Sequence, residues 1–85
     1  MNKVWHDTAW DDYIYWQAQD KKTIRKINAL IKDIERNGLN AIGKPEKLLY
    51  LPGYSVKIDE SNRLAFDIVD GRLEIYACKG HYGDK

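Results

Sequence analysis

The chain has 85 residues, which is room for one modest hydrophobic core, and a formal net charge of only +1. Cys78 is its single cysteine, which excludes an intrachain disulfide and makes a reducing compartment the simplest setting. No apolar run approaches the roughly 18 residues of a membrane span, and the first residues lack the apolar core of a secretion signal. We therefore expect a cytoplasmic protein, without membrane contact, that forms one domain over residues 1–85.

The first residues predict a short strand followed by a helix. Asn2–Trp5 has the length and composition of a strand. Asp7 or Thr8 is a suitable N-cap for a helix that runs to Gln19, because aromatic and apolar residues then recur at helical spacing.

A second helix follows at once and is the most regular element of the sequence. Asp20 can cap it, isoleucine and leucine recur every three or four residues, and Asn37-Gly38 ends it. So short a connection predicts that the two helices form an antiparallel hairpin. The second helix has a basic face made of Lys21, Lys22, Arg25, Lys26 and Lys32. That face is either a solvated surface or a stripe that tracks RNA.

Beyond Tyr54, apolar and polar residues alternate, which predicts three strands in an antiparallel meander. The Asp70-Gly71 pair is typical of a two-residue type I′ turn, and pairing outward from it would place Arg63 opposite Cys78. The preceding hairpin needs a loop of odd length or a bulge, so that Ile58 and Leu64 share one face.

The two faces of this predicted meander differ in character. Its core face would carry Leu64, Phe66, Ile68, Leu73, Ile75 and Ala77. Its other face would carry Lys57, Arg63, Ala65, Tyr76 and Cys78. The sequence thus predicts an α+β fold, in which the helical hairpin packs on one face of a small antiparallel sheet. Residues 39–53 would form an ordered connection over the edge of that sheet.

Few residues could perform acid–base chemistry. His81 stands just beyond the last predicted strand, at the end where Arg63 begins its neighbour. An imidazole can protonate a leaving group near neutral pH, and a guanidinium can balance phosphate charge. We interpret His6 as a boundary residue and Cys78 as a small strand residue. Because there is no metal-ligand spacing and no phosphate-binding glycine loop, no metal or cofactor is expected.

Several stretches of the sequence are distinctive in combination. They are Trp10–Gln17, Lys26–Asp33, Gly43-Lys44-Pro45-Glu46, Asn62-Arg63-Leu64 and His81-Tyr82. Together they resemble the YoeB/Txe branch of the RelE toxin superfamily, and the resemblance runs from Trp5 to Tyr82. It implies a RelE-like fold and a toxin that enters the ribosomal A site. Such a toxin cleaves messenger RNA by attack of a 2′-hydroxyl group, without a metal, and leaves a 2′,3′-cyclic phosphate.

The resemblance also implies roles and partners. Glu46 would be the general base, His81 the general acid, Arg63 the stabiliser of the pentavalent phosphate, and Tyr82 a residue that orients the substrate. The lysines expected to contact substrate are Lys44, Lys47, Lys57 and Lys79. The implied partners are a YefM/Axe-like antitoxin, the ribosome with its messenger RNA, and a second copy of the chain. The complex of toxin and antitoxin would bind operator DNA.

The chain departs from this family at two basic positions. Leu49 stands where the family pattern has a lysine, and Val56-Lys57 stands where the family has two arginines. Lysine lacks the bidentate fork of arginine, so phosphate stabilisation would be weaker. The alternative is therefore a weakened or non-enzymatic RelE/ParE relative that acts by binding antitoxin and operator, or gyrase. Retention of the implied acid and base argues against the gyrase-poisoning branch. The added Gly83-Asp84-Lys85 tail either perturbs the site or is harmless.

Overall fold

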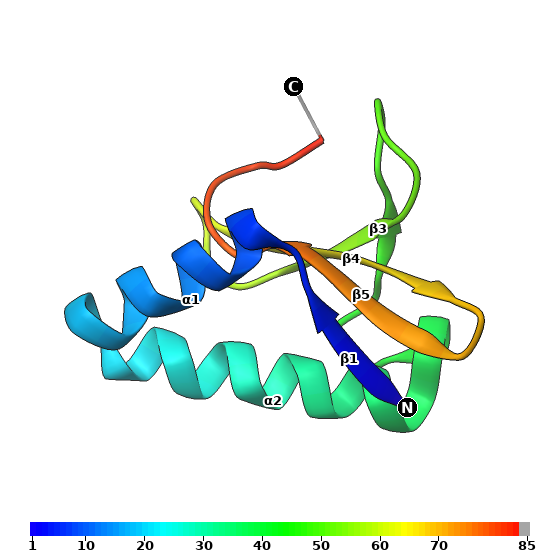
Figure 1. Ribbon diagram of the computed structural model, residues 1–85, viewed down its shortest axis with the longest axis horizontal. Coiled ribbons are helices and arrows are strands. Elements are labelled where there is room, and N and C mark those ends of the chain that lie inside the picture. The colour runs from blue at the N-terminus through cyan, green and yellow to red at the C-terminus, as the bar shows by residue number, and fades with distance from the viewer. Residues whose placement is uncertain (84–85) are drawn as a thin grey trace.

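The computed structural model describes residues 1–83, and it places two helices on one face of a five-stranded sheet (Figure 1). The helices are α1 (Asp7–Gln19) and α2 (Lys21–Asn37), and a 3-10 turn, η1, follows at Gly38–Asn40. The strands are β1 (Asn2–Trp5), β2 (Glu46–Lys47), β3 (Tyr54–Lys57), β4 (Arg63–Val69) and β5 (Arg72–Ala77). The predicted α+β fold with its helical hairpin is confirmed.

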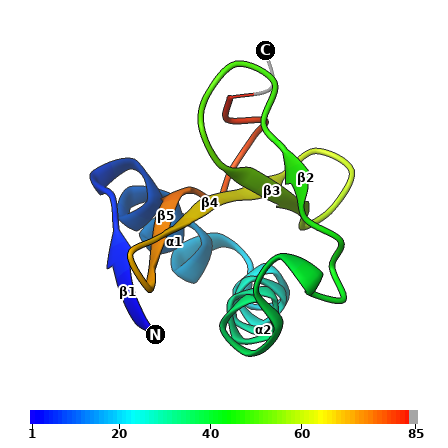
Figure 2. The same ribbon diagram turned by 90° about the vertical axis from the view of Figure 1, so that its right-hand side faces the viewer.

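The sheet has the strand order β1-β5-β4-β3-β2. Neighbouring strands are antiparallel except β1, which runs parallel to β5. Seen from the side, α2 lies below the sheet, and the C-terminal segment lies above it (Figure 2). We call the face turned away from the helices the outer face. Among the described residues, no helix is both long and apolar enough to cross a bilayer.

α2 begins where the sequence predicts. The carboxylate of Asp20 accepts hydrogen bonds from the backbone N–H groups of Lys22 and Thr23 and from the Thr23 hydroxyl. The bond from the Thr23 side chain is the largest cause that holds the pKa of Asp20 below its ordinary value. The apolar stripe of this helix is buried at Ile27, Leu30, Ile31 and Ile34. It packs on the sheet residues Val56, Ile58, Leu64, Phe66, Leu73 and Ile75.

α1 begins earlier than predicted. Its N-cap residue is His6, whose side chain makes no capping bond, so the prediction of a cap at Asp7 or Thr8 is wrong. The start of the helix is instead determined by the sheet, because the His6 N–H donates to the Ile75 carbonyl at 2.9 Å.

The pairing of β4 with β5 contains a bulge that was not predicted. The Asp70-Gly71 turn forms with both residues at positive φ, and the ladder runs as expected as far as Phe66 with Ile75. Ala65 then pairs with Ala77, which leaves Tyr76 as an extra residue on β5. The predicted pairing of Arg63 with Cys78 is therefore wrong.

This bulge exchanges the faces of the last strand residues. Ala77 packs on the outer face with Ala65 and Leu48, whereas Cys78 belongs to the main core. The predictions that Ala77 faces the core and that Cys78 shares the face of Arg63 are both wrong. Burial raises the pKa of the Cys78 thiol to about 12, which agrees with a structural residue rather than a reactive thiol.

The loop between β3 and β4 has the predicted odd length. Lys57 pairs with Arg63, which leaves the five residues 58–62 between the strands, and Ile58 joins Leu64 in the core. The connection from 39 to 53 includes the edge strand β2, which was not predicted. Its start is held by Asp33, whose carboxylate accepts hydrogen bonds from the backbone of Ile42 and Gly43.

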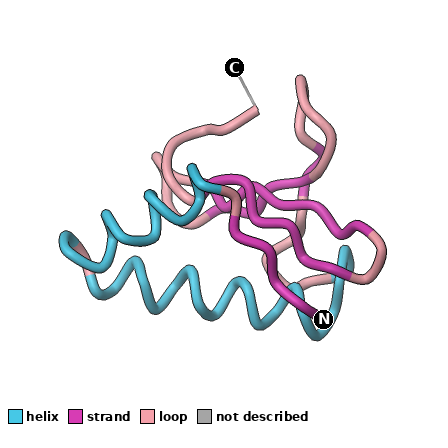
Figure 3. The backbone as a smooth tube through the Cα atoms, in the orientation of Figure 1, coloured by secondary structure: helices cyan, strands magenta, loops and turns pink. Residues whose placement is uncertain are grey.

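Side chains from α1 hold the chain just after β5. The Cys78 N–H donates to the Asp12 carboxylate at 3.0 Å, and the Trp16 indole donates to the Cys78 carbonyl at 2.8 Å. Gly80, at φ 71°, then accepts from the Arg63 N–H and donates to the Asn62 side chain. The segment that follows is a loop over the outer face (Figure 3). Of the tail named above, Asp84-Lys85 lies outside the described residues.

The anchor at Asp12 generates a prediction about stability. Asp12→Ala leaves the buried Cys78 N–H without its acceptor and should lower the free energy of unfolding by about 1–3 kcal/mol. Asp12→Asn keeps an acceptor oxygen in place. Desolvation raises the pKa of Asp12 above its ordinary value, although the hydrogen bond from the Cys78 N–H acts in the opposite direction. Because the carboxyl gives up its proton less readily in the folded protein, its ionisation favours the unfolded state.

The stability of the native protein relative to Asp12→Asn should therefore fall as the pH rises through the carboxyl range. Urea unfolding of both proteins at a series of pH values measures this difference. If the native protein instead gains stability relative to Asp12→Asn as the pH rises, the raised pKa of Asp12 in the folded protein is contradicted.

Candidate active site

A pocket of about 290 Å³ lies on the outer face of the sheet. Its lining residues are Glu46, Lys47, Leu49, Ser55, Arg63 and His81. They come from β2 and the loop after it, from β3, from β4 and from the segment after β5, so the strand order brings them together from distant parts of the chain. Three of the four predicted catalytic residues meet here.

Small side chains make room for this pocket. Glu46 pairs with Ser55, Ser55 with Ala65, and Ala65 with Ala77, so one row crosses the outer face. Ser55, Ala65 and Ala77 are each at most 2% exposed. Arg63 stands two residues before Ala65 and thus lies on the same face. The long side chains of Glu46 and Arg63 can therefore meet above this row.

The guanidinium of Arg63 is held from two directions. Its Nη2 donates to Glu46 Oε1 at 2.5 Å, and its Nε donates to Ser55 Oγ at 2.9 Å. The Arg63 side chain is 16% exposed, but that of Glu46 is 71% exposed. The Glu46 end of this ion pair is open to water, whereas the Arg63 end is largely buried. A phosphate that enters the pocket can therefore approach the guanidinium from the Glu46 side, while the bond to Ser55 lies on the buried side.

His81 reaches the same pocket from a segment that is tied down on both sides. Gly80 is bonded to Asn62 and to the backbone of Arg63, and the Gly83 carbonyl accepts from the Tyr50 N–H at 3.1 Å. The His81 side chain between these ties is exposed. A carboxylate, a guanidinium and an imidazole thus share one solvent-accessible pocket, which is a set able to move protons around a phosphodiester.

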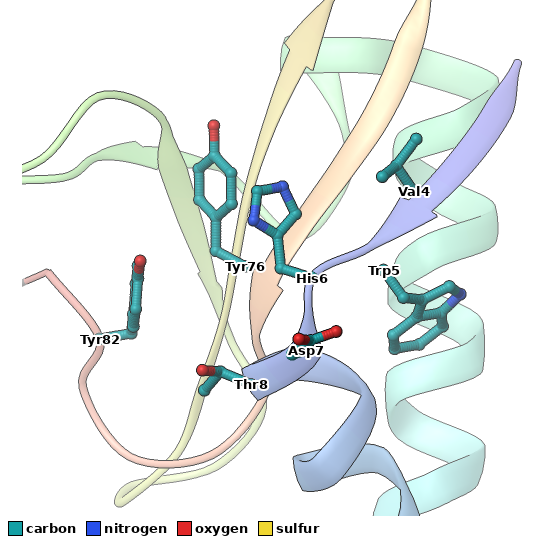
Figure 4. A pocket seen from close by; sticks show the side chains of 7 residues that line it. All are labelled: Val4, Trp5, His6, Asp7, Thr8, Tyr76 and Tyr82. Atoms are coloured by element: carbon teal, nitrogen blue, oxygen red, sulfur yellow. The ribbon is translucent and has the colours of Figure 1, made fainter.

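Tyr82 does not line this pocket. Its ring lies beside that of Tyr76, with centroids 6.1 Å apart and planes tilted by 36°, and it lines the neighbouring cavity with His6 (Figure 4). His81 and Tyr82 therefore contribute to two different hollows of the outer face.

The four predicted substrate lysines are placed unequally. Lys47 lines the pocket, although its Nζ lies 3.4 Å from the Gly53 carbonyl. Lys57 pairs with Glu60 at 2.6 Å, outside the pocket lining. The ammonium of Lys79 lies 4.7 Å from the ring centroid of Tyr15 on α1. Lys44 is exposed, at φ 57°, and likewise does not belong to the lining.

The two departures from the family pattern have unequal consequences. Leu49 lines the pocket and is 72% exposed, so an apolar side chain stands where the pattern has a lysine. Val56 is fully buried in the main core, facing the helices. Val56 therefore does not line the pocket, because its side chain lies on the face of β3 that packs against the helices.

Sequence reasoning missed Ser55 as a functional residue. Its Oγ accepts from the Arg63 side chain and is almost fully buried. The alternation of polar and apolar residues in this strand places Val56 in the core and Ser55 on the outer face. This was the signal in the sequence that could have identified Ser55. Within residues 1–83, no three histidine, cysteine or carboxylate side chains gather as a potential metal site.

Comparison with known proteins gives consistent matches over nearly the whole chain. The family model of the YoeB-like toxin of bacterial type II toxin–antitoxin systems matches residues 5–82. Toxin YoeB of Escherichia coli strain K12 is 45% identical over 84 residues, which cover 96% of this chain and 100% of that protein.

Solved structures agree with this assignment. The YoeB/ParE toxin from Agrobacterium tumefaciens superposes with a TM-score of 0.90 at 36% identity, covering 96% of this chain and 100% of that one. The YoeB dimer from Staphylococcus aureus gives a TM-score of 0.87 at 46% identity, covering 96% and 98%. A YoeB–YefM complex from the same organism has also been solved. The chain described here belongs to the YoeB-like toxins of bacterial type II toxin–antitoxin systems.

Proposed function

We propose that this toxin is an endoribonuclease that cleaves messenger RNA in the ribosomal A site, by acid–base catalysis without a metal. The observation that carries the proposal is the meeting of Glu46, Arg63 and His81 in one pocket, with the Arg63 guanidinium bonded to the Glu46 carboxylate. The pocket lies on an exposed face, where a single-stranded RNA can reach it.

The proposed reaction uses the RNA's own 2′-hydroxyl group as the nucleophile. Glu46 accepts the proton of the 2′-hydroxyl, and the 2′-oxygen attacks the adjacent phosphorus atom. The bond from phosphorus to the 5′-oxygen breaks, and the imidazolium of His81 gives a proton to that oxygen. The products are a 2′,3′-cyclic phosphate and a 5′-hydroxyl end, so protons and bonds balance.

Arg63 has the role of stabilising charge. Negative charge grows on the phosphoryl oxygens as the 2′-oxygen attacks, and a guanidinium held in advance stabilises it without reorganisation. The bond from Nε to Ser55 Oγ supports this role, because it fixes the plane of the guanidinium. When the phosphate enters, it takes the place of the Glu46 carboxylate, which is then released to act as base.

The proposed partners follow from the relatives. The Staphylococcus aureus relatives are described as a YoeB dimer and as a YoeB–YefM complex. We propose a YefM-like antitoxin and a second copy of this chain as partners, the ribosome with its messenger RNA as the substrate assembly, and operator DNA as a ligand of the antitoxin complex. Residues 1–85 would act as a single toxin domain in the cytoplasm, where translating ribosomes are found.

Cleavage on programmed ribosomes tests the proposal. The protein is treated with EDTA, and only the magnesium that the ribosome needs is restored. Wild type should cut the messenger in the A site and leave cyclic phosphate ends. Glu46→Gln and His81→Gln should each slow cleavage by about 10²- to 10⁴-fold, because each removes one proton transfer.

Thermal unfolding and antitoxin binding of the same variants provide the control, and both should match wild type. Absence of cleavage by folded wild-type protein would refute the proposal.

A catalytically weakened relative is the second candidate, and Leu49 favours it. This exposed leucine lines the pocket where the family pattern has a lysine. Leu49→Lys should raise the cleavage rate by about two- to fivefold, as expected for an exposed charge pair worth up to about 1 kcal/mol. Leu51→Lys is the matched control, since Leu51 is exposed in the same loop but does not line the pocket. Equal rates for the two variants would show that a cation at position 49 is not used.

A further inference from the structure

A second cavity, of about 460 Å³, lies between the start of α1 and the rings of Tyr76 and Tyr82 (Figure 4). Its walls come from the junction of β1 with α1 and from the side chains of Tyr76 and Tyr82. The volume is within the range of about 300–1,000 Å³ that is usual for small-molecule pockets. The proton-transfer scheme above uses none of the junction residues.

Aromatic rings form one side of this cavity. The ring of Tyr82 lies beside that of Tyr76, and the His6 ring meets Tyr76 edge-on at 4.8 Å between centroids. His6 Nε2 lies 2.9 Å from Glu74 Oε1, and Arg72 Nε donates to the other oxygen of this carboxylate. Such rings offer flat surfaces for stacking, and proteins use them to bind unstacked bases of single-stranded RNA.

The opposite side of the cavity is polar. Asp7 and Thr8 line it from the first turn of α1, and both are exposed. The Asp7 carboxylate disfavours a phosphate at this place but can accept a hydrogen bond from an exocyclic amine. Adenine, cytosine and guanine carry such an amine, whereas uracil presents carbonyl oxygens there. The cavity is thus suited to a base rather than to the RNA backbone.

The position of the cavity connects it with the reaction. His81 lines the candidate active site, and its neighbour in the chain, Tyr82, lines the cavity, so one short segment borders both hollows. This adjacency makes the cavity a candidate place for the base of a nucleotide next to the scissile phosphate. We propose that this cavity binds that base by stacking on the tyrosines, and that Asp7 selects bases that carry an exocyclic amine. The inference rests on the proposed ribonuclease function.

The first test compares cleavage rates on programmed ribosomes. The messengers differ only in one nucleotide beside the cleaved bond, which is adenine or uracil. Wild type should prefer adenine by about fivefold or more. Asp7→Asn should lose most of this preference, because an amide can also donate to a carbonyl oxygen of uracil.

Asp11→Asn is the matched control for the first test. It makes the same change of charge on an exposed residue of α1 outside the cavity, and it should keep the wild-type preference. Equal rates on both messengers for wild type, or an equal slowing on both by Asp7→Asn, would overturn the inference.

The second test measures binding and does not depend on cleavage. Trinucleotides with 2′-deoxy sugars, centred on adenine or uracil, are titrated into the protein, and the NMR signals of the His6 and Tyr82 rings are followed. Larger shifts with adenine, reduced in Asp7→Asn, are expected. If these shifts are seen but the protein does not cut messenger RNA, base binding in the cavity is supported and the proposed function is refuted. Cleavage without any shift at these rings would refute the cavity and leave the proposed function intact.

Discussion

The path of the chain at the end of β5 is the constraint on which the candidate site depends. The bulge at Tyr76 turns Cys78 into the core, where the side chains of Asp12 and Trp16 bind its backbone from α1. Gly80 is then tied to the start of β4. These bonds place His81 beside Ser55 of β3 and Arg63 of β4 in the pocket lining. The helices therefore determine where the imidazole stands, although they contribute nothing to the lining of the pocket.

Arg63 connects the rest of the site to this arrangement. Its backbone holds Gly80, while its side chain holds Ser55 and Glu46. Arg63 thus joins the segment that carries His81 to strand β2, which carries Glu46. The exposed side of this arrangement is the bond to Glu46, and the buried side is the bond to Ser55. Such a site keeps its cation largely buried and its carboxylate open to solvent, which suits the proposed exchange of the carboxylate for a phosphate.

The parts of this structure that sequence reasoning predicted are those with a long local pattern. The stripe on α2 and the alternation in β3 to β5 reveal which face is buried. The bulge left no such pattern, because Tyr76, Ala77 and Cys78 are all compatible with either face of a sheet. β2 is two residues long and too short to show a period. Glu46 was identified only through family resemblance, since its partnership with Arg63 depends on strand order, and the grouping of Tyr82 with His6 likewise depends on tertiary packing.

The most direct test of the account is cleavage of a messenger that carries a single 2′-deoxynucleotide at the scissile position in the A site. Because the 2′-hydroxyl group is the proposed nucleophile, this messenger should remain uncut by wild-type toxin, while the all-ribose messenger is cut and ends in a cyclic phosphate. Binding of the toxin to both programmed ribosomes should be equal. Cleavage of the deoxy-substituted messenger at the same bond would contradict the account, because Glu46 would then have to activate another nucleophile.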